Sequence, residues 1–395
     1  MQYIAGCIDR NNTKHNTFNF GGQQLMARRF GKKKEVKIDP LAYNIGLAGL
    51  SGIGKTTLIK KVCEELVGED GYLMLDVGKE SGHDCIDGIV SEECSDWDKL
   101  DEVLDDIIDN RTTDYKDLKV VVFDTLDELF TIGEDETIDR WNRANPDKRT
   151  KTINSVNGGF GKGLDACIEM VLDRIWSLKE VGISFIVIVH TKTKDVEDPI
   201  TGQTYQVITA NMPQRYFNAI KTKLDIFGVA YIDRDIVTEK LGRKDIKGKE
   251  ITRNIVSKEA RKIAFRSDNY NLDSKCRFPE IVSEIDLDPH QFIQAITDAI
   301  KAEQAKSGKT FEQSEKEQAE KEAEEMKELA KKEAEKKEEK KIESVIEQIK
   351  DFIKDNKGNM EAIKPLLEFS KEHGYTNPTL IDDLAIAEQA LKIVA

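Results

Sequence analysis

Five short apolar runs, separated by segments of helical periodicity, constrain the fold of residues 40 to about 300 more than any other feature. The runs are rich in β-branched and aromatic residues: YNIGLA (43–48), YLMLDV (72–77), LKVVVFD (118–124), ISFIVIVH (183–190) and LDIFGVAYI (224–232). Strands buried on both faces read as continuous apolar runs, and parallel strands need crossover helices between them. The alternation therefore predicts an α/β fold with a mostly parallel central sheet flanked by helices.

The stretch GLSGIGKTT (49–57) follows the first apolar run and precedes a helical segment. Its first eight residues match G-x-x-x-x-G-K-[ST] in full. The glycines let successive backbone N–H groups point at phosphate oxygens, Lys55 reaches the β- and γ-phosphates, and Thr56 offers its hydroxyl to Mg²⁺. We therefore predict a site for ATP and Mg²⁺ in which Lys55 also serves catalysis. The predicted binding residues are Gly49, Ser51, Gly52, Ile53, Gly54, Lys55, Thr56 and Thr57.

A magnesium ligand is also expected from a neighbouring strand. The run LKVVVFD ends in Asp124, about 70 residues after the phosphate loop. Together with Thr56, Asp124 is the predicted metal residue, and it would act through a water molecule.

Hydrolysis also needs a group that positions or deprotonates water. Thr125 follows Asp124, so the Asp-Glu pair of many ring ATPases is absent there and another carboxylate must serve. We predict Glu80, because the end of a neighbouring strand would face the γ-phosphate. Asp76 and Glu128 are the alternatives.

His190 closes the run ISFIVIVH and completes the predicted catalytic set of Glu80, Lys55 and His190. A polar residue at this place lies at the carboxyl edge of the sheet, where ligands bind in such folds. It could contact the γ-phosphate and relay its state to the following loop. The alternative is a histidine that merely ends a strand.

Charge is distributed unevenly along the 395 residues, whose net charge is −14. Residues 71–140 hold 22 acidic and 6 basic side chains, so the remainder of the chain is close to neutral. Three segments are basic: 1–39, 141–163 and 240–262. Since local potential governs polyanion binding more than net charge does, the acidic total does not exclude nucleic acid.

The order of phosphate loop, acidic strand end, Asp-Thr strand and strand with a polar end resembles the RecA-like recombinase ATPases. It is most similar to their compact phage-encoded branch, which acts in single-strand annealing or recombination. The resemblance covers about residues 40–290 and rests on VVVFDT, IVIVHT and ARKIAFRSDNYNLDSKCRFPE. It implies self-association into a ring or filament in which Lys275 and Arg277 reach the nucleotide of the adjacent subunit. Both could instead be ordinary surface charges.

The same resemblance implies single-stranded DNA binding by long loops. The first, 141–163, contains basic and aromatic side chains suited to phosphates and bases. Its candidates are Arg143, Lys148, Arg149, Lys151, Phe160 and Lys162. The second, 191–215, follows His190 directly, and 240–262 could form a basic hairpin over the same groove or an exposed edge. All could alternatively be solvated loops.

Composition divides the rest of the chain. We expect a polar, basic extension (1–39), an ATPase domain (40–300) with an acidic insertion (78–117), a charged helical linker (301–341) and a small helical module (342–395). The linker is predicted to be a solvated helix rather than a coiled coil, because only Met326, Leu329 and a few alanines suit the core positions. The module could bind a single-strand binding or replisome protein.

Three functions remain open from the sequence. The first is a DNA-dependent recombination ATPase, the second a nucleotide-gated interaction protein that scarcely hydrolyses, and the third a small-molecule kinase, for which no lid signature is present. His83, Cys85 and Cys94 lack a fourth ligand at zinc-site spacing, which argues against a metal centre. Without a secretory signal pattern or a membrane-length apolar run, a cytoplasmic location is expected, in the bacterial host if the chain is phage-encoded.

Overall fold

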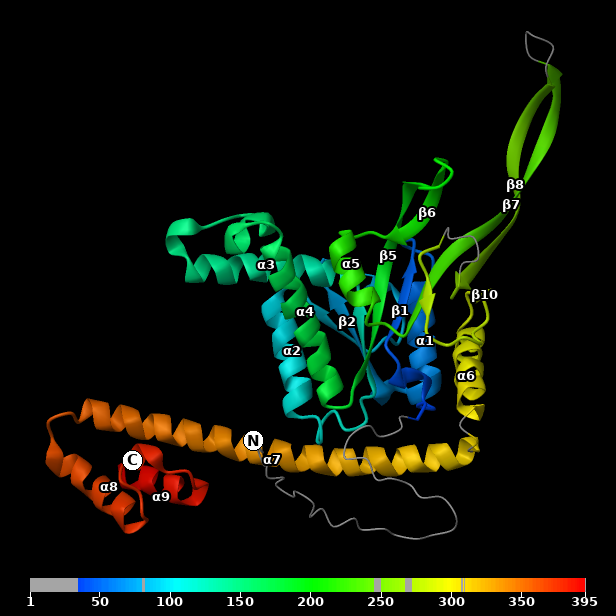
Figure 1. The fold of residues 1–395 in the computed structure, drawn as a ribbon. Coiled ribbons are helices and arrows are strands. Elements are labelled where there is room, and N and C mark those ends of the chain that lie inside the picture. The colour runs from blue at the N-terminus through cyan, green and yellow to red at the C-terminus, as the bar shows by residue number, and fades with distance from the viewer. Residues whose placement is uncertain are drawn as a thin grey trace, which may run out of the picture. The chain divides into compact units, whose positions relative to one another are not determined.

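A mostly parallel sheet forms the centre of the chain (Figure 1). The computed structural model describes residues 35–79, 82–244, 250–266, 272–306, 308 and 310–394. Within these residues the strands are β1 (Ile45–Gly49), β2 (Tyr72–Val77), β3 (Ser91–Cys94), β4 (Val120–Asp124), β5 (Ser184–Glu197), β6 (Thr204–Ala210), β7 (Ile226–Lys244), β8 (Glu250–Ala264), β9 (Lys275–Cys276) and β10 (Glu284–Asp286). The α-helices are α1 (Lys55–Val67), α2 (Trp97–Asp109), α3 (Leu126–Ala144), α4 (Lys162–Glu180), α5 (Gln214–Lys221), α6 (Pro289–Ala305), α7 (Phe311–Asp355), α8 (Met360–Glu372) and α9 (Leu384–Val394).

The strand order brings the predicted nucleotide-site residues of different strands to one edge of the sheet. The order is β10-β8-β7-β1-β5-β4-β2-β3, and the strands from β7 to β3 are parallel. Strand β8 pairs antiparallel with β7, and β10 pairs antiparallel with β8. Strand β5 lies between β1 and β4, so Gly49 pairs with His190, and Asp76 pairs with Asp124 on the far side of β4. The predicted α/β fold with a mostly parallel central sheet flanked by helices is thereby confirmed.

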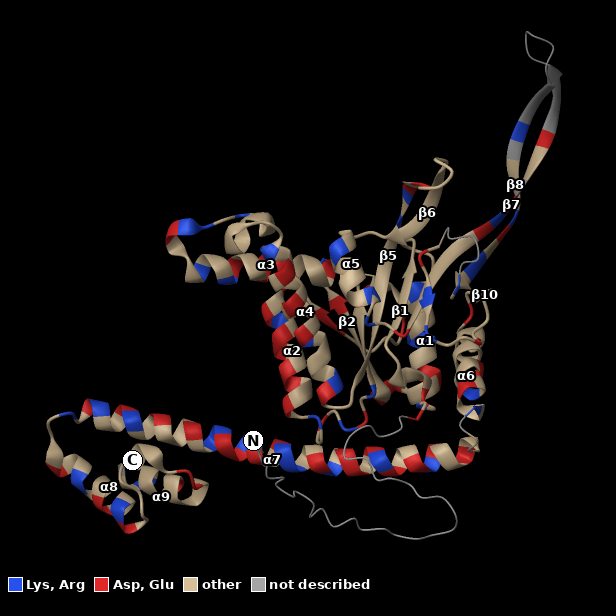
Figure 2. Ribbon diagram, viewed as in Figure 1, with Lys and Arg blue, Asp and Glu red and all other residues tan. Residues whose placement is uncertain are grey.

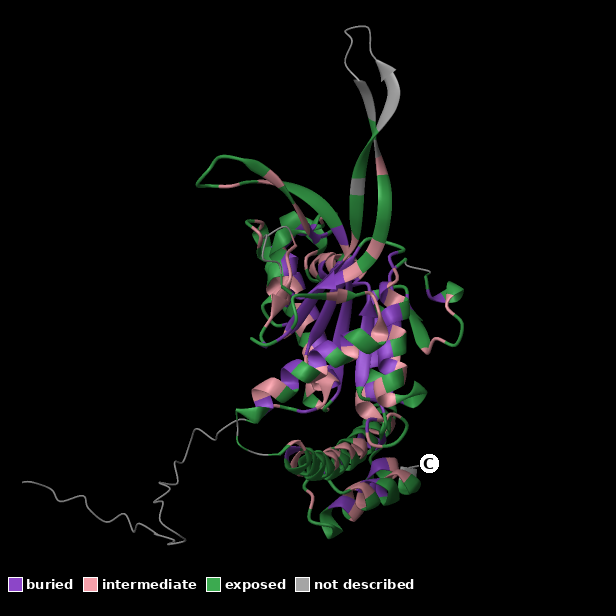
Figure 3. Cartoon of the chain, turned by 90° about the vertical axis from the view of Figure 1, so that its right-hand side faces the viewer, coloured by how far each residue is buried: buried purple, intermediate pink, exposed green. Residues whose placement is uncertain are grey.

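Both faces of the sheet are buried, which explains the continuous apolar runs. In β4, Val121 and Phe123 pack with helices α2 to α5, whereas Val120 and Val122 pack with α1 and α6. The strands accordingly appear as a buried layer between half-exposed helices (Figure 3). A strand in such a layer needs an apolar side chain at every position.

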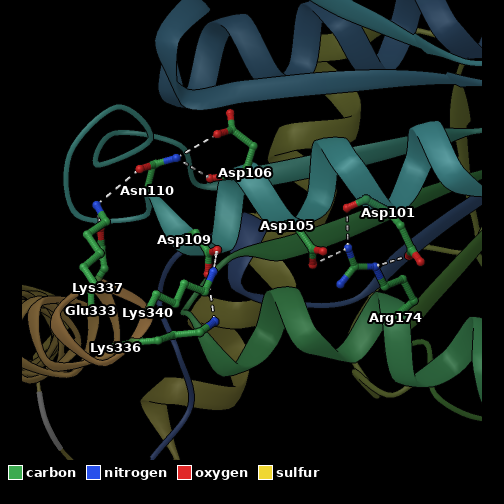
Figure 4. A network of polar contacts seen from close by, with 10 residues as sticks. All are labelled: Asp101, Asp105, Asp106, Asp109, Asn110, Arg174, Glu333, Lys336, Lys337 and Lys340. Atoms are coloured by element: carbon green, nitrogen blue, oxygen red, sulfur yellow. Dashed lines mark hydrogen bonds and ion pairs between the residues drawn. The ribbon is translucent and has the colours of Figure 1, made fainter. Parts of the chain in front are cut away.

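The described residues of 78–117, the expected acidic insertion, contribute regular structure to the domain. They add β3 in parallel to β2 and contribute α2, whose N-cap Asp96 accepts a hydrogen bond from the backbone N–H of Lys99. The apolar stripe of α2 is fully packed in the core: Trp97, Leu100, Leu104 and Ile107. The acids lie on the outer side, where Asp101 and Asp105 pair with Arg174 of α4 (Figure 4).

The two expected long loops are largely regular structure. Helix α3 continues to Ala144 and α4 begins at Lys162, and the segment between them contains short 3₁₀ turns anchored by buried Ile153 and Val156. Residues 191–210 form a hairpin, because β5 continues to Glu197 and pairs antiparallel with β6. Alternating Thr and Lys side chains at 191–194 suit such a ribbon, which has one strand face in solvent.

The described parts of segment 240–262, residues 240–244 and 250–262, lie on two long antiparallel strands. Beyond Ala230 of β7 and Ile263 of β8, the two strands leave the sheet as a ribbon, which we call the β7–β8 arm. The arm and the β5–β6 hairpin project from the same edge (Figures 1 and 3). Arg234 and Glu259 form a cross-strand ion pair of 2.9 Å along it.

Helix α7 runs for 45 residues and passes residue 341 without a break. Likewise, α6 runs through residue 300. Neither helix ends at the boundaries expected from composition. The last turns of α7 pack with α8 and α9 in a small separate core that includes Ile349, Leu366 and Ala387. Among the described residues, no helix combines the length and apolar character needed to cross a membrane.

One stripe of α7 contacts the α/β domain. Its residues are spaced three or four apart and are mostly polar: Gln318, Glu322, Met326, Leu329, Glu333 and Lys337. Gln318 bonds the backbone of Val36 and Ile38 at 2.8 Å, and Glu322 pairs with Lys119 at 3.2 Å. This segment is therefore a docked helix rather than a solvated spacer or a coiled coil.

The strongest part of the contact lies beyond the end of α2 (Figure 4). Glu333 accepts hydrogen bonds from the backbone N–H of Thr112 at 2.9 Å and from its hydroxyl at 2.5 Å. Lys336 and Lys340 both pair with Asp109, and their hydrogen bonds lower the pKa of that carboxyl.

Glu333→Ala is expected to loosen α7 from the domain. Hydrogen bonds to a charged group contribute about 1.5–3 kcal/mol each, so amide exchange across residues 318–340 should accelerate about tenfold or more. Glu335→Ala is the matched control, because Glu335 is exposed on the same helix and has no ion pair among the described residues.

Equal exchange in both variants would show that the contact at Glu333 does not hold α7.

The ion pairs of Asp109 should make the attachment of α7 depend on pH, with a known sign. Since its folded pKa is lowered, its contribution is complete above its ordinary value of 3.8 and is lost as the pH falls through the lowered one. Asp109→Asn should reproduce that loss at neutral pH in the same exchange measurement.

Candidate nucleotide site

The phosphate loop turns sharply between the end of β1 and the start of α1. Gly52 and Gly54 have φ angles of 74° and 110°, which residues with a side chain rarely adopt. Gly54 is the N-cap of α1 and has no side-chain cap, so the first backbone N–H groups of the helix are available to an anion. A cavity of about 240 Å³ opens beside the loop and is lined by Ser51, Gly52, Gly54, Lys55, Thr56, Thr57, Asp76, Gly82, His83, Ile86, Asp124 and His190.

Lys55 is buried inside the turn. Its ammonium donates hydrogen bonds to the carbonyls of Gly49 at 3.0 Å and Leu50 at 3.1 Å. These bonds hold the charge against the loop backbone, beside the N–H groups at the start of α1. The loop thus concentrates a full positive charge and a helix terminus on one small volume, as a polyphosphate requires.

Thr56 and Asp124 meet at the floor of the cavity. The hydroxyl of Thr56 donates to Oδ2 of Asp124 at 2.6 Å, although the two residues are 68 positions apart. Hard oxygen donors of this kind suit Mg²⁺, which is usually held in proteins by one or two side chains, with water and phosphate completing its shell. The pair fits the predicted metal, which would neutralise phosphate charge next to Lys55.

His83 is a cavity residue that sequence reasoning missed in this role. Its Nε2 lies 3.2 Å from Oδ2 of Asp124, and its Nδ1 lies 3.9 Å from Oδ2 of Asp76. Burial opposes a charge on His83, but the hydrogen bond to Asp124 and the nearby carboxylates outweigh it and raise the pKa of the imidazole. The short turn His83–Cys85 places the imidazole beside Asp124, and no residue spacing in the sequence predicts this contact.

The positions of the candidate residues bear on which carboxylate could activate water. Glu80, the predicted residue, lies outside the described residues. Asp76 lines the cavity, whereas Glu128 packs over Gly78, where an added Cβ would lie 2.6 Å from its Oε2. Of the two alternatives, Asp76 is therefore the one at the cavity.

His190 links the cavity to the β5–β6 hairpin. Its Nδ1 lies 3.0 Å from Oδ2 of Asp127, and its backbone carbonyl accepts from the N–H of Asn211 at 2.7 Å. Burial opposes ionisation of Asp127, but the interaction with His190 outweighs it and lowers the pKa of Asp127. The position of His190 at the cavity suits a group that senses a bound phosphate. Its imidazole is already paired with the Asp127 carboxylate.

Lys275 and Arg277 lie at the other edge of the sheet. Cys276 pairs with Ile226, the first residue of β7, whereas the phosphate loop follows the last residue of β1. The Lys275 ammonium donates to the carbonyls of Lys221, Thr222 and Leu224, and Arg277 also bonds Thr222. Within one chain these groups hold the end of α5.

The DNA candidates lie on the segment that joins α3 and α4 and at its two ends (Figure 2). Phe160 is 99% exposed and has a φ of 55°. Arg143 pairs with Glu136 at 2.8 Å. The other four are exposed and have no ion pair among the described residues: Lys148, Arg149, Lys151 and Lys162.

Comparison with known proteins is consistent with this geometry. A search of curated proteins finds no match. Among solved structures, a prototypical ATPase from the type III secretion system of pathogenic bacteria is 18% identical with a TM-score of 0.28; the match covers 49% of this chain and 53% of that one, so it spans about half of that ATPase. Residues 41–263 match the family model described as AAA domain. That match covers more than half of the chain and includes the phosphate loop, Asp124 and His190, so the chain belongs to the AAA domain family of P-loop ATPases.

Proposed function

We propose that this ATPase acts on single-stranded DNA, in recombination, annealing, repair or replication of the phage type. ATP with Mg²⁺ would be held by the phosphate loop, Thr56 and Asp124. Subunits would assemble on the strand as a ring or filament in the ATP state, and hydrolysis would release it.

One observation supports the proposal most directly. Exposed basic and aromatic side chains lie at the same edge of the sheet as the nucleotide cavity. Strand β5 passes from His190, at the cavity, into a hairpin where Lys192 and Lys194 are exposed. The α3–α4 segment presents Phe160 together with four exposed cations that form no ion pair with any described residue. Cations that follow a backbone and an aromatic face on which bases stack are what a single strand needs.

A nucleotide-gated interaction protein is the second candidate, favoured by α7 and the small helical core at its end. The module buries its own apolar residues yet exposes Met360 (65%) and Leu380 (61%). In this alternative, nucleotide binding would control a contact with a single-strand binding or replisome protein, and turnover would be slow.

Turnover of ATP should rise when single-stranded DNA is added, and Phe160→Ala should reduce that rise. Stacking of a base on an aromatic side chain contributes about 1–3 kcal/mol, so the DNA concentration for half-maximal stimulation should increase roughly 5- to 100-fold. The side chain is almost fully exposed, so its removal costs the fold little.

Leu380→Ala is the control, because it removes an exposed apolar side chain from the C-terminal module instead. Tight ATP binding with no stimulation by DNA in the parent protein would reject the first function and favour the second. Turnover that depended on a small acceptor molecule would reject both.

A further inference from the structure

The base of the β7–β8 arm lies against the phosphate loop, a contact that the site described above does not use. Gly49, the last residue of β1, pairs with Ala230 of β7, which in turn pairs with Ile263 of β8. Arg261 comes two residues earlier on β8, opposite Ile232. It therefore stands where the sheet ends and the arm begins.

The side chain of Arg261 holds the outer side of the loop. Its Nη1 donates to the carbonyl of Ile53 at 3.1 Å and lies 3.9 Å from where a Cβ on Gly54 would be. The Ile53 carbonyl and the Gly54 N–H belong to one planar trans peptide unit and point in opposite directions. A bond that fixes the carbonyl therefore also fixes the direction in which the N–H of Gly54, at the start of α1, is presented.

The backbone of Arg261 also makes a hydrogen bond close to the loop. Its carbonyl accepts a hydrogen bond from the N–H of Leu287 at 2.9 Å. The Leu287 side chain in turn lies 3.3 Å from the position of a Cβ on Gly54. Arg261 and the segment after β10 thus enclose Gly54 from the side of the arm.

The guanidinium of Arg261 has more hydrogen-bond donors than its bond to the Ile53 carbonyl uses. Arginine carries five N–H donors in a rigid fork, and Arg261 is exposed, without an ion pair among the described residues. A lysine or a neutral residue could not hold the carbonyl with the same geometry.

We propose that Arg261 is a positioning residue that couples the β7–β8 arm to the nucleotide. It orients the Gly54 N–H for phosphate, and as part of β8 it moves with the arm. A polyanion on the described cations of the arm, among them the exposed Arg253 and Lys258, shifts Arg261 and so changes the affinity of the loop. Such coupling is reciprocal, so nucleotide changes polyanion affinity by the same factor.

The choice of single-stranded DNA as the ligand of the arm rests on the proposed function. The contact between Arg261 and the phosphate loop does not depend on that choice.

The test measures the dissociation constant of a non-hydrolysable ATP analogue with Mg²⁺, with and without single-stranded DNA. Arg261→Ala should weaken analogue binding about 3- to 10-fold without DNA, the effect of one lost hydrogen bond. The coupling factor, about 5-fold or more in the parent protein, should fall toward one.

Two variants separate positioning from folding. Arg261→Lys keeps one donor and should recover part of the analogue affinity, which a general loss of structure would not allow. Arg234→Ala removes an arm arginine paired with Glu259 and should leave the analogue affinity and the coupling factor intact, even where it weakens DNA binding.

The outcomes distinguish the two proposals. A parent protein that binds no single-stranded DNA rejects the proposed function, and the analogue affinity of Arg261→Ala alone then decides the role of Arg261. If DNA binds but Arg261→Ala changes neither the affinity nor the coupling factor, the positioning role is overturned while the proposed function stands.

Discussion

Lys55→Ala is expected to reduce ATP turnover at least about 100-fold and to weaken ATP binding strongly. The ammonium is buried within the loop and donates hydrogen bonds to the carbonyls of Gly49 and Leu50. A preorganised donor removed from a site of low dielectric typically costs a factor of about 10²–10³ in rate. Binding of a fluorescent ATP analogue and steady-state phosphate release measure the two effects.

Lys61→Ala is the matched control for this prediction. Lys61 is exposed on the same helix and makes no ion pair among the described residues, so its loss should leave both quantities near those of the parent. Turnover in Lys55→Ala within tenfold of the parent would mean that the loop does not hold the reacting phosphates.

Asp124→Asn is expected to lower turnover by a factor of about 100 while changing the magnesium dependence. The carboxylate is buried and accepts a hydrogen bond from Thr56, so it is placed to stabilise a cation close to the phosphates. The amide keeps the size of the side chain but loses the negative charge. The Mg²⁺ concentration for half-maximal turnover should therefore rise, and ATP binding without metal should change much less.

Asp135→Asn serves as the control, because Asp135 is exposed on α3 and has no ion pair among the described residues. A lower rate with an unchanged magnesium dependence would assign Asp124 to another task, such as holding His83. The melting temperature of each variant separates these effects from a loss of folded protein.

The fold and the centre of the site were predictable because their signals are local. A strand covered on both faces must be apolar throughout, and a loop that wraps phosphate must contain glycine at fixed positions. Asp124 could be paired with Thr56 because it ends a buried apolar run about 70 residues after the phosphate loop, and the structure brings the two side chains together.

Other features depend on contacts between residues far apart in sequence. Glu333 meets Thr112 across 221 positions, and its stripe on α7 is polar, so apolar periodicity could not reveal it. His83 reaches Asp124 from a short 3₁₀ turn, which leaves no periodic pattern. For residues 191–215 the family resemblance implies a loop, and their charged side chains do not argue against one, because a ribbon in solvent tolerates charge as readily as a loop does.

Strand β5 has two different environments along a single uninterrupted backbone. Its first six residues are buried in the sheet, and beyond Thr191 most of its side chains face solvent in the ribbon with β6. A paired ladder resists bending far better than a loop, so a small rotation where His190 meets Asp127 swings the distant tip, with its exposed Ile200, through a wider arc. If a bound nucleotide displaced His190, the ribbon would therefore carry that displacement from the cavity to the protein surface.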